Sequence, residues 1–472
     1  MPETPQFTAK SEASQVFGRA LRSEVPRKSL GALGPRPTSF DAISILEDQA
    51  IGRVPDLVPL RYERMAASRF SFLRGAAAVM AADLMLTPST GLTVQICGDA
   101  HVSNFGVFAS PERRLTFDVN DFDETLPGPF EFDVKRMVAS LAVAMADQGL
   151  TEADQADAVR RTAGAYRESM GRFANQGTME VWFKVLDVKE NIELLRSMFT
   201  TKKGSPVDSI IAKADRSNAQ RAYAKLTTMV DGVPQFIADP PTVVPLDELL
   251  AVQGIEQTPP EVIAAALEGY RGSLLSDRSV LLDQFTPVDM ARKVVGVGSV
   301  GTRCFLFLLL GRDYSDPLIL QIKEAMPSVF EAHLGAVSEP NSGARVVAGQ
   351  RLMQTTPDLF LGHTRQSFPD GSDHDFYFRQ FHDMKASADL TATQSAKNFA
   401  AYGEVCAWTL ARAHARSGDR LAVASYLGTS QNFDNQMVDW AFAYAERNAA
   451  DYASFLGAIE SGRLPTASST EL

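Results

Sequence analysis

Residues 94–136 read VQICGDAHVSNFGVFASPERRLTFDVNDFDETLPGPFEFDVKR. We expect the rest of the fold to be organised around this segment. The apolar run VQIC predicts a short strand, and GDAHVSN predicts a polar loop. FGVFA and LTFDV predict two further strands, which the turn SPERR joins. The segment therefore predicts a polar loop followed at once by a β-hairpin.

Acidic residues are concentrated in the second half of this segment. Six carboxylates fall within the sixteen positions from Asp118 to Asp133. Side chains that repel one another this strongly indicate a nearby cation. Three oxygen-bearing side chains are expected to meet there, namely Asp99 at the start of the polar loop, Asn104 at its end, and Asp121 after the second hairpin strand.

The composition narrows the class of protein. A length of 472 residues allows roughly three domain-sized units, and 45% apolar with 22% charged residues is typical of globular proteins. A net charge of -11 argues against a general nucleic-acid partner. The three cysteines form no CxxC pair, and no apolar run is long enough for a signal peptide or a membrane span. We expect a cytoplasmic protein without a membrane partner.

Composition and periodicity divide the chain into regions. Arg74 lies inside a helical pattern, where it is either a functional arginine or a surface residue. The motifs GARVVAGQRLMQ and DFYFRQF predict strands. The expected regions are an extended N-terminal arm at 1–40, a helical lobe at 41–290 with an inserted segment at about 183–240, a β-rich lobe at 291–385, and helices at 386–472 that complete the large lobe.

A glycine-rich turn precedes the β-rich lobe. Gly296, Gly298 and Gly301 form GxGxxG, but an apolar strand follows them where a dinucleotide-binding fold needs a helix. A hairpin whose second strand ends at Lys323 instead matches the phosphate-covering loop of kinase-like enzymes. Glu331, or alternatively Glu324, is a candidate partner for Lys323.

These motifs resemble known families. GDAHVSN resembles the catalytic loop, and NDFDE the metal-binding motif, of the aminoglycoside-phosphotransferase and choline-kinase branch of the protein-kinase-like superfamily. Over nearly its whole length the chain also resembles an uncharacterised bacterial family, domain of unknown function 2252. The motifs that carry this second resemblance are FLRGAA, CGDAHVSNFGVF, FDVNDFDE, GPFEFDVKR, RVVAGQRLMQ, DFYFRQFHDMK and LARAHAR.

The kinase-like resemblance implies roles for individual residues. Asp99 would be the catalytic aspartate, Asn104 and Asp121 would hold magnesium, and Lys323 would bind the α and β phosphates of ATP. The loop from Gly296 to Gly301, including Gly298 and Ser299, would cover the phosphates, with Glu331 as a supporting residue. Asp133 would brace the catalytic loop, and FYFRQF would be the hinge strand beside adenine.

Two features depart from the kinase-like pattern. Cys97 replaces the usual histidine before Gly-Asp, which puts the bracing of the loop in doubt. The glycine loop and Lys323 follow the catalytic loop, whereas kinases have the opposite order, and LARAHARSGD, similar to the helix that leads into that loop, lies near the C-terminus. The expected fold is therefore α+β and two-lobed, a circularly permuted protein-kinase-like fold with extra helical segments.

The leading functional hypothesis is an ATP- and magnesium-dependent phosphotransferase that acts on a hydroxyl of a small molecule or a protein. Nucleotidyl transfer on the same fold and a non-catalytic, nucleotide-binding pseudokinase are the alternatives. A metallophosphoesterase is less favoured, because the six histidines are scattered without partner motifs.

Overall fold

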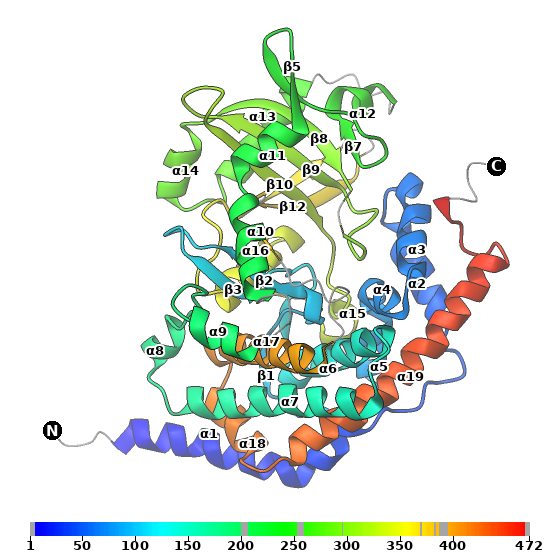
Figure 1. Ribbon diagram of the computed structural model, residues 1–472, viewed down its shortest axis with the longest axis vertical. Coiled ribbons are helices and arrows are strands. Elements are labelled where there is room, and N and C mark those ends of the chain that lie inside the picture. Colours follow the sequence, from blue (N-terminus) through cyan, green and yellow to red (C-terminus); the bar gives the residue numbers. More distant parts are fainter. Residues whose placement is uncertain are drawn as a thin grey trace.

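The computed structural model describes residues 5–199, 206–252, 259–294, 296–368, 371–381, 384–386 and 395–467. It is a mixed α+β fold, as the sequence predicts. In Figure 1 a sheet and its covering helices form the upper part, and long helices form the lower part. The predicted hairpin, β2 (Phe105–Ala109) with β3 (Leu115–Val119), lies between these parts.

The upper part is built on a six-stranded antiparallel sheet with the order β11-β12-β10-β9-β8-β7. The hairpin predicted after the glycine loop is confirmed as β9 and β10. The sheet begins before the predicted boundary at residue 291, because pairing along β9 recruits β8 although β8 has few apolar residues. The strands are β7 (Val243–Pro245), β8 (Thr286–Lys293), β9 (Cys304–Leu310), β10 (Pro317–Ala325), β11 (Gly362–Ser367) and β12 (Asp373–Gln380).

The segment between β10 and β11 corrects one prediction. GARVVAGQRLMQ forms helix α16 (Ser342–Met353) and not a strand, and the Asn341 side chain caps it by accepting a hydrogen bond from the Ala344 amide. Arg345, Val346 and Val347 are all buried, because the helix is covered on more than one side. This burial hides the helical period in the sequence. The predicted strand at DFYFRQF is confirmed as β12, which ends one residue before Phe381.

The lower part is a layer of helices around the largest hydrophobic core. Its helices are α1 (Pro5–Glu24), α6 (Phe130–Asp147), α7 (Glu152–Ala174), α17 (Ala396–Ser417), α18 (Arg420–Leu427) and α19 (Asn432–Glu460). The prediction of an extended arm at 1–40 is wrong over α1, which packs on α18. Gly18 allows this close approach, because a Cβ there would lie 2.1 Å from the carbonyl oxygen of Ala422.

The remaining elements connect and cover these two parts. The predicted helix around Arg74 is interrupted after Gly75, and the segment predicted as an insertion contains α9 to α11 and the β5–β6 hairpin. These elements are α2 (Ala42–Ile51), α3 (Val58–Ala66), α4 (Arg69–Gly75), α5 (Ala77–Leu84), β1 (Thr93–Ile96), β4 (Leu126–Pro129), α8 (Thr178–Trp182), α9 (Ile192–Met198), α10 (Pro206–Arg216), α11 (Ala219–Leu226), β5 (Thr227–Val230), β6 (Val233–Phe236), α12 (Leu246–Val252), α13 (Pro259–Arg271), α14 (Ser276–Leu282) and α15 (Glu331–Leu334).

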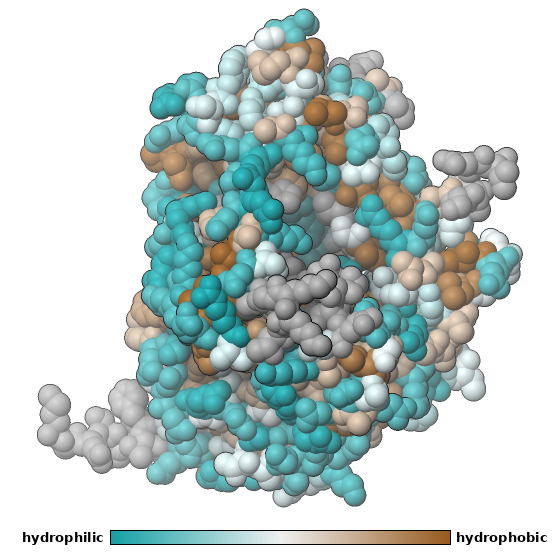
Figure 2. Space-filling view, viewed as in Figure 1, coloured by the Kyte–Doolittle hydropathy of each residue, from teal (hydrophilic) through white to brown (hydrophobic). Residues whose placement is uncertain are grey.

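The surface is mainly polar, as expected when most apolar side chains pack in the interior. Figure 2 shows a mainly hydrophilic face on which apolar side chains occur in small, separate groups. Within the described ranges, each helix is too short or too polar to cross a bilayer.

Candidate functional site

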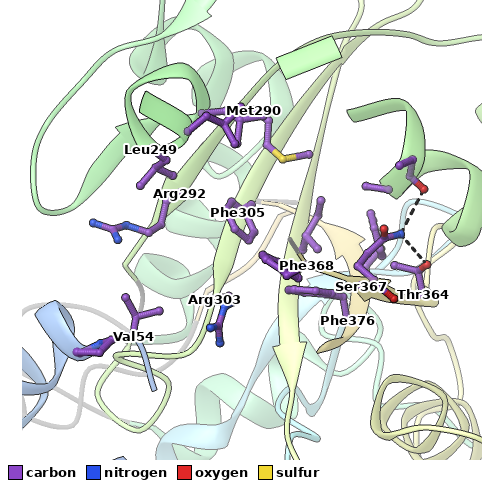
Figure 3. A pocket seen from close by; sticks show the side chains of 18 residues that line it. Val54, Leu249, Met290, Arg292, Arg303, Phe305, Thr364, Ser367, Phe368 and Phe376 are labelled. Atoms are coloured by element: carbon purple, nitrogen blue, oxygen red, sulfur yellow. Dashed lines mark hydrogen bonds between the residues drawn. The ribbon is translucent and has the colours of Figure 1, made fainter. Parts of the chain in front are cut away.

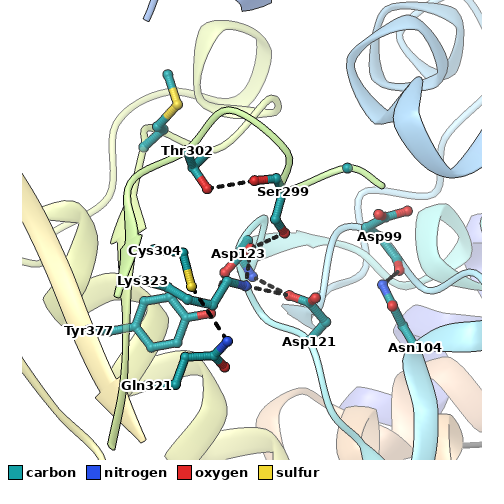
Figure 4. Close-up of polar contacts among 12 residues, drawn as sticks. Asp99, Asn104, Asp121, Asp123, Ser299, Thr302, Cys304, Gln321, Lys323 and Tyr377 are labelled. Carbon is teal, nitrogen blue, oxygen red and sulfur yellow. Dashed lines mark hydrogen bonds and ion pairs between the residues drawn. The ribbon is translucent and has the colours of Figure 1, made fainter. Parts of the chain in front are cut away.

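Most of the predicted site residues meet where the two parts of the molecule face each other. One cavity, of about 120 Å³, is lined by Asp99, Asn104, Asp121, Gly296, Gly298 and Ser299. An adjoining cavity, of about 290 Å³, shares Asp121, Gly296 and Ser299 with it and adds Lys323. Figure 4 shows Asp121 and Asp123 between Asp99 on one side and Lys323 on the other. Residues almost two hundred positions apart in the chain therefore form one site.

Asp99 is held in place by a buried arginine. The guanidinium of Arg136 donates from Nε to Asp99 Oδ1 over 2.7 Å and from Nη2 to the carbonyl oxygen of Leu73 over 2.7 Å. Burial raises the pKa of Asp99, although the positive charge of Arg136 opposes this rise. The result is an oriented carboxylate of increased basicity at the cavity wall.

The loop that carries Asp99 is braced from two helices. Asp133 on α6 accepts hydrogen bonds from the amides of Cys97, at 2.8 Å, and Gly98, at 3.0 Å, and His414 on α17 lies 3.2 Å from the same carboxylate. Gly98 has φ of +79°, and a Cβ there would lie 2.2 Å from the carbonyl oxygen of Glu124. Two backbone hydrogen bonds thus fix the turn before Asp99.

Asn104 closes the same loop. Its amide nitrogen donates to the carbonyl oxygen of Asp99 over 2.8 Å. This hydrogen bond uses the nitrogen and leaves the amide oxygen as the atom that can bind a cation. His101 lies 3.7 Å from Asp99, but burial lowers its pKa well below the usual value. His101 is therefore a neutral packing residue beside Asp99 and not a charged partner.

Lys323 pairs with a residue that the sequence did not single out. Its Nζ lies 2.6 Å from Asp123 Oδ2 and 3.9 Å from Asp121 Oδ1, and Tyr377 donates to Asp123 Oδ1 over 2.6 Å. Tyr377 is the register partner of Lys323 on β12. Burial alone would lower the pKa of Lys323, but the two aspartates raise it. Lys323 is therefore charged, although only 2% of its side chain is exposed.

The expected pairing of Lys323 with Glu331 or Glu324 is wrong. Glu331 lies 3.2 Å from the guanidinium of Arg345 and accepts a hydrogen bond from the Ser328 amide. Glu324 binds Arg303 and His374 instead. Side chains alternate along β10, so Glu324 cannot share the face of Lys323. The partner is instead Asp123, the second aspartate of the NDFDE motif.

The turn after α2 and helix α3 hold the glycine loop by its carbonyl groups. Arg53 donates to the carbonyl oxygens of Gly298, at 2.9 Å, and Val300, at 2.6 Å, and Arg64 donates to that of Gly296, at 2.7 Å. The Val54 amide donates to the carbonyl oxygen of Gly301 over 2.7 Å. Gly296 and Gly301 have positive φ, which few other residues adopt.

Two other polar side chains reach this region. The Ser299 hydroxyl lies 3.5 Å from Asp123 Oδ2, at the limit of a hydrogen bond. Arg74 lines the cavity of Asp99, and its buried Nε has no hydrogen-bond partner among the described residues. Burial lowers the pKa of Arg74, while Asp99 and Asp121 act against this effect. Arg74 is thus available to an anionic group in the cavity.

Two titratable groups at the rim have displaced pKa values. Burial raises the pKa of Glu124 to about 7, although the Val329 amide donates to its carboxylate. Burial and the charge of Arg379 lower the pKa of Lys385 to about 7. Both groups change charge near neutral pH.

The site suits a hard cation that is bound together with phosphate. Among the described residues no group of three or more His, Cys, Asp or Glu side chains is arranged to hold a metal ion without other ligands. Asp121 and Asn104 offer carboxylate and amide oxygens, the donor types that Mg²⁺ takes from proteins when substrate phosphates and water complete its coordination. Asp121 and Asn104 therefore fit magnesium only where phosphates and water supply its remaining ligands.

Comparison with known proteins identifies the family. No curated protein and no solved structure matches the chain. Residues 53–458 match the family model DUF2252, described as an uncharacterized protein conserved in bacteria. This match covers the whole site, from the N-terminal arginines to the helix of His414. The chain therefore belongs to the DUF2252 family.

Proposed function

We propose that this protein is an ATP- and magnesium-dependent phosphotransferase that transfers the γ-phosphoryl group to a hydroxyl of a small molecule or a protein. The observation that carries the proposal is the position of the Lys323–Asp123 pair beside the glycine loop and Asp121, in a site whose other wall holds Asp99. A lysine, a covering loop and an oriented aspartate are the parts that phosphoryl transfer needs.

In this proposal each residue of the site has a separate part in the reaction. The hydroxyl oxygen of the substrate attacks the γ phosphorus, its proton passes to Asp99, and the bond to the β–γ bridging oxygen breaks to release ADP. Lys323 binds the α and β phosphates, and the loop Gly296–Gly301 covers them. Asn104 and Asp121 would hold magnesium, which neutralises phosphate charge when bound.

The circularly permuted, kinase-like fold is part of this proposal. Helix α17 ends beside β1, where the Gln95 amide donates to the Ser417 hydroxyl over 3.1 Å. A chain that ran from the glycine loop through β10, β12 and α17 and continued into β1 would have the usual kinase order. Residues 417 and 95 are thus neighbours at the place where such a chain would continue, which favours permutation.

The lysine pair differs from the usual kinase arrangement. Kinases pair this lysine with a glutamate on a helix of the small lobe. Here Glu331 on the short helix α15 pairs with Arg345 instead, and α16, the next helix, has no acidic residue. Asp123 lies on the loop between β3 and β4 and makes the equivalent charge contact. We infer that nucleotide binding requires Lys323 to be shared between Asp123 and the phosphates.

Incubation of the full chain with bacterial cell extract and ATP labelled at the γ or the α phosphate tests the reaction. Transfer of the γ label would support a phosphotransferase. Transfer of the α label would show instead that the protein is a nucleotidyl transferase. Binding of ATP without transfer of either label would indicate a non-catalytic nucleotide sensor. Hydrolysis of p-nitrophenyl phosphate without ATP would favour a phosphoesterase instead.

Substitution of Asp99 tests the assigned base. We expect Asp99→Asn to reduce γ transfer by about 10²–10⁴-fold, since general-base catalysis contributes this much, while ATP affinity measured by calorimetry stays close to that of the wild type. Asp157→Asn, which removes an exposed carboxylate on α7, is the matched control. Transfer by Asp99→Asn at the rate of this control would reject the role.

A further inference from the structure

A second cavity lies on the opposite face of the six-stranded sheet and has no part in the proposed reaction. It measures about 260 Å³ and is bounded by strands β8 to β12, helices α12 and α13, and the short segment at Val54 and Pro55. Figure 3 shows Phe305, Phe368 and Phe376 grouped in its interior. This volume is several times that of one water molecule, roughly 30 Å³.

The charged groups of this cavity are of one sign. Arg292 and Arg303 line it, and the described lining residues include no carboxylate. Arg292 is only 12% exposed, and its buried Nε has no hydrogen-bond partner among the described residues. Within the part of the chain that the structure describes, its one ion pair is with Asp56. This pair spans 3.4 Å to a carboxylate that is 62% exposed, so the contact is weak.

We propose that this cavity binds an amphipathic anion, a carboxylate with a medium-length acyl chain. The chain would lie among the phenylalanines, and the carboxylate would bind the guanidinium of Arg292. Arg303 is less available, because it already binds Glu324 at 3.0 Å and lies over the ring of Phe368. An apolar interior with an underused cation at the wall matches the two halves of such a ligand.

The cavity is also connected to the nucleotide site. Ile322 lines the cavity, while its neighbour Lys323 points to the opposite face of β10. Val54 lines the cavity as well, and its amide binds the carbonyl oxygen of Gly301 at the end of the glycine loop. Occupancy of the cavity is therefore expected to change the affinity for ATP. The binding itself does not rest on the proposed function.

Calorimetry with the full chain and three ten-carbon probes tests the site. We expect decanoate to bind about tenfold more tightly than 1-decanol, since a charge-assisted hydrogen bond is worth about this factor, and decylammonium to bind most weakly. Equal affinities for decanoate and decanol, or no binding of either probe, would overturn the proposal.

Two kinds of variant locate the binding. Arg292→Gln should abolish the preference for decanoate and leave decanol binding intact, whereas Arg312→Gln, which removes an arginine 79% exposed, should change neither. Ala266→Trp should fill the cavity and abolish the binding of both probes. If circular dichroism shows that Ala266→Trp does not fold, Leu249→Trp, which fills the cavity from helix α12, takes its place. Unchanged decanoate binding in a folded filling variant would also overturn the proposal.

Discussion

The two faces of strand β10 are stabilised by different kinds of interaction. Leu318, Leu320 and Ile322 belong to one hydrophobic cluster, whereas Gln321 and Lys323 face the polar site between the two parts of the molecule. The apolar face is stabilised by contact area, which neighbouring side chains can supply in many ways. The polar face depends on individual partners, because a buried charge is tolerated only beside its counter-charge. We therefore expect substitutions on the polar face to affect both function and stability, and those on the apolar face at positions that do not line the cavity to affect stability alone.

The largest expected effect is on the polar face. Lys323→Met should reduce γ transfer by about 10²–10³-fold, since the charge that binds the phosphates is lost. It should also lower the free energy of unfolding by about 3 kcal/mol, because Asp123 loses its partner. The double variant Lys323→Met with Asp123→Asn should recover much of the stability but none of the activity. Labelled-ATP assays and urea unfolding measure the two effects.

Recovery of transfer in this double variant would contradict the role of Lys323 in phosphate binding. Ile322→Leu, the adjacent position on the apolar face, keeps side-chain volume and is the matched control for the unfolding measurement.

The second prediction concerns the apolar face alone. Leu320→Ala should lower the free energy of unfolding by about 3 kcal/mol, because the side chain is fully buried and its removal leaves a cavity. Transfer per folded molecule should match the wild type. Urea unfolding gives the stability, and the labelled-ATP assay at low temperature gives the activity. A loss of activity without a loss of stability would show that the two faces are not independent.

The smallest predicted effect is a dependence of stability on pH. The pKa of Glu124 is raised from 4.5 to about 7 by burial, so the folded protein holds a proton that the unfolded chain releases at lower pH. The free energy of unfolding should therefore fall as pH rises from 4.5 to 7. Glu124→Gln removes this term and should be more stable than the wild type above pH 7. Thermal unfolding from pH 4 to 8 measures the difference.

The exposed Glu446 on α19 provides the comparison for this measurement. Glu446→Gln should follow the wild type at every pH. A constant offset between Glu124→Gln and the wild type across this range would mean that Glu124 does not titrate near pH 7.

The sequence by itself determined the local elements of the site. The loop with Asp99 and Asn104, the β2–β3 hairpin and the hairpin that ends at Lys323 all follow from patterns within short segments, as does family membership. Alternation and turn residues are local properties, so each can be recognised without its neighbours in space.

The tertiary structure decided what local patterns do not contain. Lys323 has acidic residues nearby in sequence, yet it pairs with Asp123, two hundred positions away. The sequence of helix α16 resembles a strand because burial on several sides removes its polar face. The composition of α1 does not predict a packed helix, because its contact with α18 lies outside the local sequence. A buried charge selects its counter-charge by distance in the folded chain. Sequence order carries no record of that distance, so only the fold could place Asp123 beside Lys323.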